Sequence, residues 1–429
     1  MKDPVEVDAR TGRSVASEGC RPALKKGSRS IRAGRACCGC GACVCACPYG
    51  AVSMAETQEG FLLATVDRSL CRGCGACLRA CPAEEEGKIN GGKASCGVRL
   101  FAARNKDEEV RRRSASGGVF TCLAERVLAR GGVVYGAAWD SASLRVRHVS
   151  VETRDDLARL SGSKYVQSAI GRAYRDAKEM LQAGRDVLFS GTPCQNEGLR
   201  RYLAREYPNL TTVDVICHGV ASPGVLARYL REIDPRHAPL EVSFRDKARG
   251  WRAFSFKVTD AVSRADILCE TQGENVFLKG FLSNLLLRES CSKCRQEWKL
   301  KSDITLGDYW NISAVEPSFA DDMGVSAVLV STRKGAALWT SVSNDVTSVE
   351  TPPAPFFKDN RCVLFPSVGH PRRHAFFEAF ARNGTGVSEL ISHFTPWPRL
   401  AKMIWKMRRH WQKKRIAERA HEIARKDFA

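Results

Sequence analysis

The stretch CCGCGACVCACP, from Cys37 to Pro48, contains six cysteines before its final proline. A second stretch, CRGCGACLRACP from Cys71 to Pro82, repeats this pattern 34 residues later. Both copies read C-x2-C-x2-C-x3-C-P, a spacing with which one loop supplies three thiolates to a 4Fe-4S cubane and the fourth to a second cluster. The duplicated spacing therefore predicts a ferredoxin-like module with two 4Fe-4S clusters.

The repeat also selects the ligands among the cysteines of the first copy. Cys38 and Cys45 stand opposite Arg72 and Arg79, so they lie outside the repeated unit and are expected to be small buried thiols. Two ligand sets follow, with the last cysteine of each motif exchanged: Cys37, Cys40, Cys43 and Cys81 for one cluster, and Cys71, Cys74, Cys77 and Cys47 for the other. A zinc site or a disulfide framework is the weaker alternative, because zinc sites usually use two separated cysteine pairs and disulfide-rich chains are usually small and secreted.

Length and composition place the chain among large globular proteins. Its 429 residues suffice for two or three domains, and 44% of them are hydrophobic. The first 36 residues contain no apolar segment of the kind that a signal peptide requires, and no run of 18 apolar residues exists. With 19 cysteines, many of them in cluster motifs, we expect a cytoplasmic protein of a reducing, oxygen-poor compartment.

The net charge of +20 is unevenly distributed along the chain. Residues 399–429 contain eleven Lys or Arg against three acidic residues, and apolar residues recur there at helical spacing: Leu400, Met403, Ile404, Met407 and Trp411. We favour a solvated terminal helix that packs by this apolar stripe. The next reading is a peripheral contact with the inner membrane surface. Nucleic acid is the least favoured partner, since no nucleic-acid-binding fold accompanies the segment.

The pattern along the chain predicts five regions. They are a disordered basic extension at 1–35, the ferredoxin-like module at 36–90, a linker at 91–110, a larger domain at 111–390 and a basic amphipathic C-terminal helix at 391–429. In the larger domain, helices are expected at 116–131, 173–184, 195–207, 223–233 and 276–287, between strands at 131–139, 144–151, 186–191, 210–219, 304–310 and 325–332. This alternation predicts an α/β core with a mixed sheet, beside the α+β module. Three further strands in a row, at 241–247, 254–260 and 266–270, suggest that part of the sheet is antiparallel.

Four cysteines of the larger domain form a second candidate metal site. Cys194 and Cys217 each follow a predicted strand, at the carboxyl edge where open α/β sheets bind ligands. The motif CSKC adds Cys291 and Cys294 at metal-ligand spacing, and together the four could hold a third cluster. Taken alone, CSKC is also compatible with zinc or a redox dithiol, and isolated cysteines are most often core residues.

Two segments rich in Ser and Gly, SASGGVF from Ser114 and SGSKYVQ from Ser161, suggest a phosphate site, because the first leads directly into a predicted helix. Ordinary helix capping by Ser114 or Ser116 is the alternative reading. No G-x-G-x-x-G follows a strand, so a Rossmann dinucleotide site is not supported. Lys164 in the second segment is a candidate partner for a phosphate or a flavin ring.

Seven motifs follow one another behind the double cysteine repeat: SASGGVFTCLAERVL, GGVVYGAAW, LSGSKYVQS, VLFSGTPCQNEGLRRYL, CHGVASPGV, CSKC and SDITLGDYW. In this order they resemble the coenzyme F420 hydrogenase/dehydrogenase beta-subunit family, from about Cys37 to about Gly335. The resemblance implies a non-Rossmann FAD site, and a third 4Fe-4S cluster on Cys194, Cys217, Cys291 and Cys294. It also implies flavin contacts from Ser116, Gly117, Gly118, Ser163, Lys164, Tyr165 and Gln167. Ala115 and Asn196 depart from the family pattern, which tends to have a Ser and a small apolar residue at these positions.

The expected function is that of an iron-sulfur flavoprotein oxidoreductase. Such a protein would pass electrons from reduced ferredoxin or a partner redox subunit, by way of clusters and FAD, to a two-electron acceptor such as the deazaflavin coenzyme F420. His218, beside Cys217, is the candidate proton donor, although a lone histidine more often has a structural role. Asp308 is a weaker candidate, for orienting a cluster loop or the flavin. The alternatives are a non-catalytic electron-transfer beta subunit, an oxidoreductase of surface-polysaccharide synthesis, and a redox- or iron-sensing interaction protein.

Overall fold

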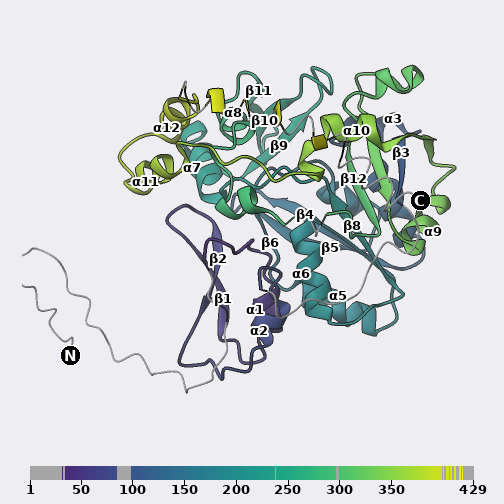
Figure 1. Ribbon diagram of the computed structural model, residues 1–429, viewed down its shortest axis with the longest axis horizontal. Helices are drawn as coiled ribbons and strands as arrows, with labels where there is room; N and C mark the ends of the chain where they lie inside the picture. The colour runs from purple at the N-terminus through teal and green to yellow at the C-terminus, as the bar shows by residue number, and fades with distance from the viewer. Residues whose placement is uncertain are drawn as a thin grey trace, which may run out of the picture.

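The computed structural model describes residue 31 and residues 34–84, 98–236, 238–295 and 299–398, with part of the segment 400–418 (Figure 1). The extension predicted at 1–35 lies outside the described residues except for positions 31, 34 and 35. A small N-terminal module and a larger domain of helices around a mixed sheet lie side by side in Figure 1. This arrangement confirms the predicted fold class.

Two antiparallel strands and two short helices form the N-terminal module. They are α1 (Ala42–Ala46), β1 (Val52–Glu56), β2 (Leu62–Val66) and α2 (Ala76–Ala80). Each helix begins after a glycine, Gly41 or Gly75, and their φ angles of 71° and 73° lie in the left-handed region. Glycine adopts this conformation without strain, so the C-G-A sequence that both motifs share fixes where the two helices begin.

Nine strands form one sheet at the centre of the larger domain. They are β3 (Arg99–Asn105), β4 (Val133–Asp140), β5 (Arg145–Val151), β6 (Ser168–Ala169), β7 (Val187–Gly191), β8 (Leu210–Val215), β12 (Ile304–Asp308), β13 (Ser326–Val330) and β14 (Val346–Glu350). Their order is β14-β3-β13-β12-β8-β7-β4-β5-β6. Strands β12, β8, β7 and β4 run parallel, while β13, β3, β14 and β5 add antiparallel pairs on the two sides. The parallel centre brings the carboxyl ends of β7 and β8 to one edge of the sheet.

Helices cover both faces of this sheet. They are α4 (Val119–Leu128), α5 (Ala173–Gln182), α6 (Pro193–Leu203) and α9 (Arg333–Ser341). On one face, α4 and α9 contribute to a core cluster with Val134 and Leu188. On the other face, α5 and α6 share a core cluster with Cys40 and Ala42 of the N-terminal module. The module therefore docks on the side of the sheet that α5 and α6 cover.

A second, separate sheet consists of β9 (Leu240–Asp246), β10 (Ser255–Asp260) and β11 (Asp266–Thr271). These strands pair antiparallel, as the sequence predicts, but their expected place in the main sheet is wrong. Their buried side chains, among them Phe244 and Phe256, pack in a cluster with helices instead. The helices of this cluster are α7 (Pro223–Ile233), α8 (Val276–Leu282), α11 (Arg373–Ala381) and α12 (Val387–Phe394).

The prediction of a linker at 91–110 is wrong from residue 98 onward. Residues 99–105 form β3, which lies between β13 and β14. Leu100 and Ala102 belong to one core cluster, and Phe101 and Ala103 belong to the cluster on the opposite face. A strand that is buried on both faces lacks the polar and apolar alternation of a half-exposed strand, so the sequence gives a weak signal. Residues 85–97 lie outside the described part of the chain.

The described residues between 400 and 418 are helical, as predicted. Their apolar stripe does not pack against the protein, because Leu400, Met403, Ile404, Met407 and Trp411 are between 43% and 65% exposed. The reading in which this stripe packs on the domain is therefore wrong. Ile416, further along the same segment, is 5% exposed and joins a core cluster. No helix among the described residues is long and apolar enough to cross a membrane.

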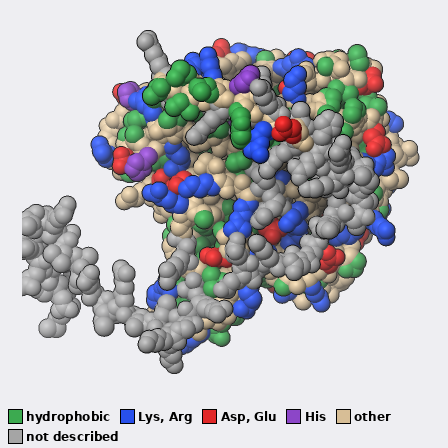
Figure 2. Space-filling view, in the orientation of Figure 1, with side chains coloured by type: hydrophobic (Ala, Val, Ile, Leu, Met, Phe, Trp, Pro, Cys, Tyr) green, Lys and Arg blue, Asp and Glu red, His purple; other side chains and the backbone are tan. Residues whose placement is uncertain are grey.

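The positive charge is not confined to the C-terminal segment. Figure 2 shows Lys and Arg side chains spread over the visible face, with acidic side chains among them. Residues before 399 therefore contribute to the net charge of +20 as well as residues 399–429.

Candidate functional site

The structure brings the cysteines of the two repeated motifs together across the module. Burial raises the pKa of the Cys43 thiol above its ordinary range, and the neighbouring thiols of Cys81, Cys37 and Cys77 raise it further. Burial also raises the pKa of Cys77, and the neighbouring Cys47 adds to this effect. Cys81 thus lies beside the first motif and Cys47 beside the second, as an exchanged pair of ligand sets requires.

The eight thiols match in number the ligands of two 4Fe-4S clusters. Within the described residues, no three His, Cys, Asp or Glu side chains converge closely enough to hold one metal ion. A cubane differs, because each of its four thiolates binds a different iron and the sulfurs therefore stay further apart. Burial disfavours a free thiolate, and a positively charged cluster core would compensate for that cost. Ligation by these eight cysteines stays a prediction.

The two sets of cysteines differ in their exposure. Each set has two buried thiols, Cys40 and Cys43 in the first and Cys77 and Cys47 in the second, but the second set also has an exposed one, Cys74, whereas the other two of the first set are half-buried. The first set also faces the larger domain, since a Cβ built on Gly198 of α6 would lie 3.0 Å from Cys40 Sγ. The second set is therefore nearer to solvent, and the first set is nearer to the larger domain.

Buried arginines of the larger domain bind the module through its backbone. Arg288 is 5% exposed, and its guanidinium donates to the carbonyl oxygens of Cys37 (2.8 Å) and Leu62 (3.0 Å). Arg201 is equally buried and donates to the carbonyl oxygen of Cys81 (2.6 Å). Cys37 and Cys81 belong to the same predicted ligand set. The larger domain thus holds the loops of that set by main-chain atoms.

Gln167 and Arg175 add further contacts between the larger domain and the module; these contacts, with those of Arg288 and Arg201, are called the joint. The Gln167 amide donates to the carbonyl oxygen of Leu62 (3.1 Å) and accepts from the Leu62 N–H (2.9 Å). A Cβ built on Gly39 would lie 2.1 Å from Gln167 Nε2, so the approach of the two segments requires glycine there. Arg175 donates to the carbonyl oxygen of Cys45 (3.1 Å). The amide of Gln167, which the resemblance assigns to the flavin, is therefore engaged by the module.

A cavity of about 800 Å³ opens between the module and the larger domain. Its wall contains the four cysteines predicted to hold a third cluster: Cys194, Cys217, Cys291 and Cys294. The first lies at the start of α6, the second follows β8, and the other two lie in or directly after a 3-10 helix at Glu289–Lys293. Burial raises the pKa of Cys217, and the thiols of Cys291, Cys194 and Cys294 raise it further. Cysteines from three separate segments thus meet at one place.

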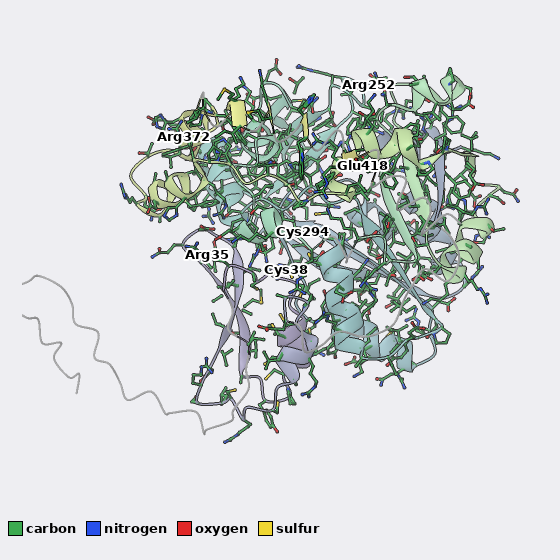
Figure 3. All side chains as sticks on the ribbon, in the orientation of Figure 1. Arg35, Cys38, Arg252, Cys294, Arg372 and Glu418 are labelled. Carbon is green, nitrogen blue, oxygen red and sulfur yellow. The ribbon has the colours of Figure 1, made fainter. Side chains whose placement is uncertain are left out.

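Cys38 and Cys362, which the sequence leaves outside the cluster sets, also line this cavity. The Cys38 thiol lies beside those of Cys194 and Cys40, and Cys40 together with burial raises its pKa. Cys38 and Cys294, both labelled in Figure 3, come from the module and the larger domain and line the same cavity. Cys38 therefore lies between a predicted ligand of a ferredoxin cluster and the predicted ligands of the third cluster. Sequence spacing carries no signal for this position, because it depends on how the two domains dock.

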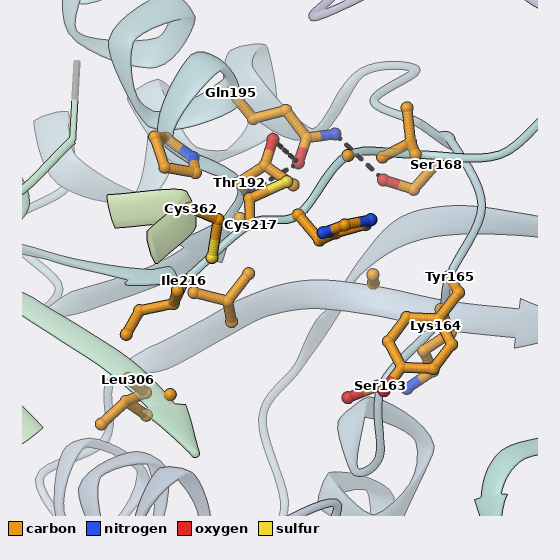
Figure 4. A pocket seen from close by; sticks show the side chains of 18 of the residues that line it. Ser163, Lys164, Tyr165, Ser168, Thr192, Gln195, Ile216, Cys217, Leu306 and Cys362 are labelled. Atoms are coloured by element: carbon orange, nitrogen blue, oxygen red, sulfur yellow. Dashed lines mark hydrogen bonds between the residues drawn. The ribbon is translucent and has the colours of Figure 1, made fainter. Parts of the chain in front are cut away.

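A buried hydrogen-bond network holds the start of α6 (Figure 4). The Gln195 amide oxygen accepts from the Thr192 N–H (2.9 Å), and its amide nitrogen donates to Ser168 Oγ (3.0 Å). Ser168 Oγ lies 3.0 Å from His148 Nδ1, and His148 Nε2 lies 3.1 Å from the carbonyl oxygen of Ser190. Burial lowers the pKa of His148 to about 4. The ring is therefore neutral, with Nε2–H donating to the carbonyl and Nδ1 accepting from the hydroxyl.

Six of the seven residues that the resemblance assigns to the flavin line the same cavity: Ser116, Gly118, Ser163, Lys164, Tyr165 and Gln167. Gly117 does not line it. The Gly117 N–H donates to Ser326 Oγ (3.0 Å), and a Cβ at this position would lie 2.5 Å from the carbonyl oxygen of Ala103. Gly117 is therefore needed where its loop packs against β3 and β13. The flavin contacts of all seven residues stay predictions.

Lys164 and Tyr165 occupy one side of the cavity (Figure 4). Lys164 Nζ donates to the carbonyl oxygen of Ser161 (2.7 Å). The side chain is half-buried by area, but its ammonium is withdrawn from bulk water, which lowers the pKa of Lys164 to about 7. The ring of Tyr165 stacks on Phe281, with 4.7 Å between the ring centroids. An anion bound beside Lys164 would favour the ammonium form and raise this pKa again.

His218 also lines the cavity. Asn284 Nδ2 donates to the carbonyl oxygen of Val368 (2.7 Å), and this orients the amide so that Oδ1 accepts from His218 Nε2–H (2.7 Å). Burial lowers the pKa of His218. A neutral ring with Nε2–H engaged in this way has Nδ1 for proton exchange. In this state Nδ1 accepts a proton first, so the predicted role of a proton donor, which stays a prediction, requires prior protonation of the ring.

Asp308 belongs to a buried ion pair that the sequence does not reveal. It accepts from Arg245 (2.7 Å) and from Trp251 Nε1 (3.2 Å). The Arg245 side chain is 3% exposed and lies against the rings of Phe254 and Trp310. Asp308 thus orients an arginine in the cavity wall, which is more specific than the loop-orienting role expected for it.

Known protein families match both the N-terminal module and the larger domain of the chain. Residues 36–84 match a 4Fe-4S dicluster domain, residues 100–174 match the N-terminal domain of the coenzyme F420 hydrogenase/dehydrogenase beta subunit, and residues 184–354 match its C-terminal domain. The last two matches together span more than half of the 429 residues. A solved chain of the F420-reducing NiFe hydrogenase complex from Methanosarcina barkeri is 18% identical, with a TM-score of 0.41, over 61% of this chain and 85% of that chain. No curated protein matches the chain.

Proposed function

Because the chain belongs to the coenzyme F420 hydrogenase/dehydrogenase beta-subunit family and contains a 4Fe-4S dicluster domain, we propose that it is a flavin-dependent oxidoreductase. Its electron donor would be ferredoxin or a partner redox subunit, and its acceptor a small two-electron carrier, for which coenzyme F420 is one candidate. The observation that supports this proposal is the cavity, which four predicted cluster cysteines and six predicted flavin residues line together.

The donors in the chain fit three 4Fe-4S clusters and one FAD. The exchanged motifs supply eight thiols for two clusters, and the cavity cysteines supply four for a third. The cavity volume of about 800 Å³ lies within the range of cofactor sites. Bound clusters would carry single electrons, and FAD would connect one-electron with two-electron chemistry.

The residues of the chain would position these groups and manage protons. Arg288 and Arg201 fix the module against the larger domain. The network through Gln195 fixes the start of α6, and with it the position of a predicted cluster ligand. His218 would exchange a proton at Nδ1, and Lys164 would pair with an anionic group of the flavin or the acceptor.

Cofactor content tests the proposal directly. The chain, purified without oxygen, should contain about twelve iron and one FAD. Cys217→Ala should lower the iron to about eight, because it removes one ligand of the third cluster. Cys269→Ala is the matched control, since Cys269 is a half-buried cysteine of β11 outside the cavity, and its iron should stay at about twelve. Roughly eight iron in the unchanged chain would contradict the third cluster, and a chain without flavin would contradict the FAD site.

The family description favours a second candidate, a relay subunit that passes electrons to a neighbouring enzyme. The purified chain distinguishes the two. Steady turnover of coenzyme F420 or of an artificial dye by reduced ferredoxin supports the oxidoreductase. Reduction of the clusters, seen by their visible absorbance, without turnover of any acceptor supports the relay.

A further inference from the structure

The C-terminal helical segment leaves an apolar face uncovered. Leu400, Met403, Ile404, Met407 and Trp411 follow one another at helical spacing, and the described residues of this segment are helical. These five make up half of the ten large apolar side chains that are exposed among the described residues. The other five are scattered singly through the chain, as is normal for a protein surface. The exposed apolar side chains of this segment are therefore clustered, unlike the other five.

The segment is attached to the protein at both ends of this face. Just before the segment, the Trp397 ring contacts the ring of His370 edge-on, with 5.1 Å between the ring centroids. Ile416 is 5% exposed and packs in a core cluster with Tyr309 and Phe356. The exposed face is thus held on the body of the protein and presented outward, and it is not the consequence of a loose end.

Basic residues accompany this face. Residues 399–429 contain eleven Lys or Arg and three acidic residues, and Lys402, Lys406 and Arg415 are exposed. The Arg415 guanidinium lies 4.6 Å from the centre of the Trp411 ring. An exposed apolar face with tryptophan, beside many cations, is the composition of helices that lie in the interface of an anionic membrane.

We propose that the described helical residues between 400 and 418 dock the protein on an anionic lipid surface, with the apolar face at the boundary between headgroups and acyl chains. A second copy of the chain fits this face less well, because its segment and its surface carry the same positive charge. Nucleic acid would attract the lysines and arginines but would leave five large apolar side chains in water.

Vesicle co-sedimentation of the full-length holoprotein tests this proposal. Vesicles of pure phosphatidylcholine are compared with vesicles of equimolar phosphatidylcholine and phosphatidylglycerol. The protein should sediment with the mixed vesicles and bind the neutral ones about tenfold or more weakly. The double variant Met403→Ser/Met407→Ser should weaken binding to the mixed vesicles by about tenfold or more. Lys402→Glu/Lys406→Glu should also weaken it and reduce its dependence on salt.

The control is Val262→Ser, because Val262 is 81% exposed but lies far from the segment in sequence, in the turn after β10. Its vesicle binding should equal that of the unchanged protein, and all variants should keep the unchanged iron content. Failure to bind mixed vesicles, or binding that the methionine variant retains, overturns the proposal. Binding to duplex DNA that outlasts the methionine change would assign the segment to nucleic acid. A dimer in sedimentation velocity that the methionine change dissociates would assign it to self-association.

Discussion

Arg288 offers the sharpest test of how the ferredoxin-like module is held. Its guanidinium donates to the carbonyl oxygens of Cys37 (2.8 Å) and Leu62 (3.0 Å) and to Gln167 Oε1 (3.1 Å), and the residue is 5% exposed. Arg288→Met keeps most of the side-chain volume but removes every donor. The Leu62 oxygen retains the Gln167 amide as a partner, whereas the Cys37 oxygen loses the bond from Arg288.

The docking free energy lost in Arg288→Met follows from these contacts. Net hydrogen bonds to a charged group contribute about 1.5–3 kcal/mol each, and a buried acceptor that loses its partner costs about 1–3 kcal/mol. The bond to the Cys37 oxygen is lost outright, and the acceptors of the other two bonds keep a second partner. We therefore expect Arg288→Met to weaken the docking of the module by about 3–5 kcal/mol. Since about 1.4 kcal/mol corresponds to a factor of ten, the undocked population should rise by more than about a hundredfold. Arg288→Lys should recover only part of this, because an ammonium lacks the planar fork.

Hydrogen exchange of the holoprotein, kept free of oxygen, measures this population. The Leu62 N–H, which donates to the Gln167 side chain (2.9 Å), should exchange more than about a hundredfold faster in Arg288→Met. The matched control is Arg79→Met, because Arg79 is exposed and makes one bond to a carbonyl of the same module, that of Cys74 (3.2 Å). In Arg79→Met, the exchange rate of the Leu62 N–H should change by less than about threefold. If Arg288→Met behaved like the control, the arginine joint would not be what holds the module.

Three further outcomes are expected. Cys38→Ala and Cys45→Ala should leave the iron content unchanged, whereas Cys81→Ala should remove about four iron, and a cluster lost in either of the first two would show that the ligand sets are wrong. Reduction by an acidic ferredoxin should slow as ionic strength rises, because the net charge of +20 attracts it over a Debye length of about 10 Å at 0.1 M salt; a rate that does not depend on salt would refute this attraction. His148 has a pKa of about 4 in the folded protein and about 6.5 when unfolded, so unfolding takes up a proton below pH 6.5. Lowering the pH from about 7.5 to about 5 should therefore reduce the free energy of unfolding in urea by about 2 kcal/mol more than in His148→Gln, and equal losses in both proteins would contradict a neutral buried ring.

Local spacing predicted those parts of the structure that depend on neighbours in sequence. The positions of the cysteines from Cys37 to Cys81 imply an exchange between the two motifs, and the structure places Cys81 and Cys47 accordingly. Alternating strands and helices predicted the main sheet, because each element buries one face or one stripe. The positions of Cys194 and Cys217 after two adjacent parallel strands predicted that they would meet.

Other features depend on contacts that sequence does not encode locally. Strand β3 is buried on both faces, so its short apolar run resembled a linker with a few hydrophobic residues. Cys38 meets Cys194 only because α1 docks on α6. The stripe from Leu400 to Trp411 shows the opposite error, because helical periodicity indicates an apolar face but does not say whether the protein itself covers it.

The joint between the two domains has a consequence for how such proteins diversify. Arg288, Arg201 and Arg175 all bind peptide carbonyl oxygens of the module, and none of these bonds depends on which side chain the module carries at that place. Any duplicated cysteine motif whose loops follow the same path would present the same acceptors. A different two-cluster module with the same backbone path, a different outer surface and different redox potentials would therefore keep these bonds, whereas the ion pairs of Glu59 with Arg373 and of Glu56 with Arg145 would demand particular side chains of it.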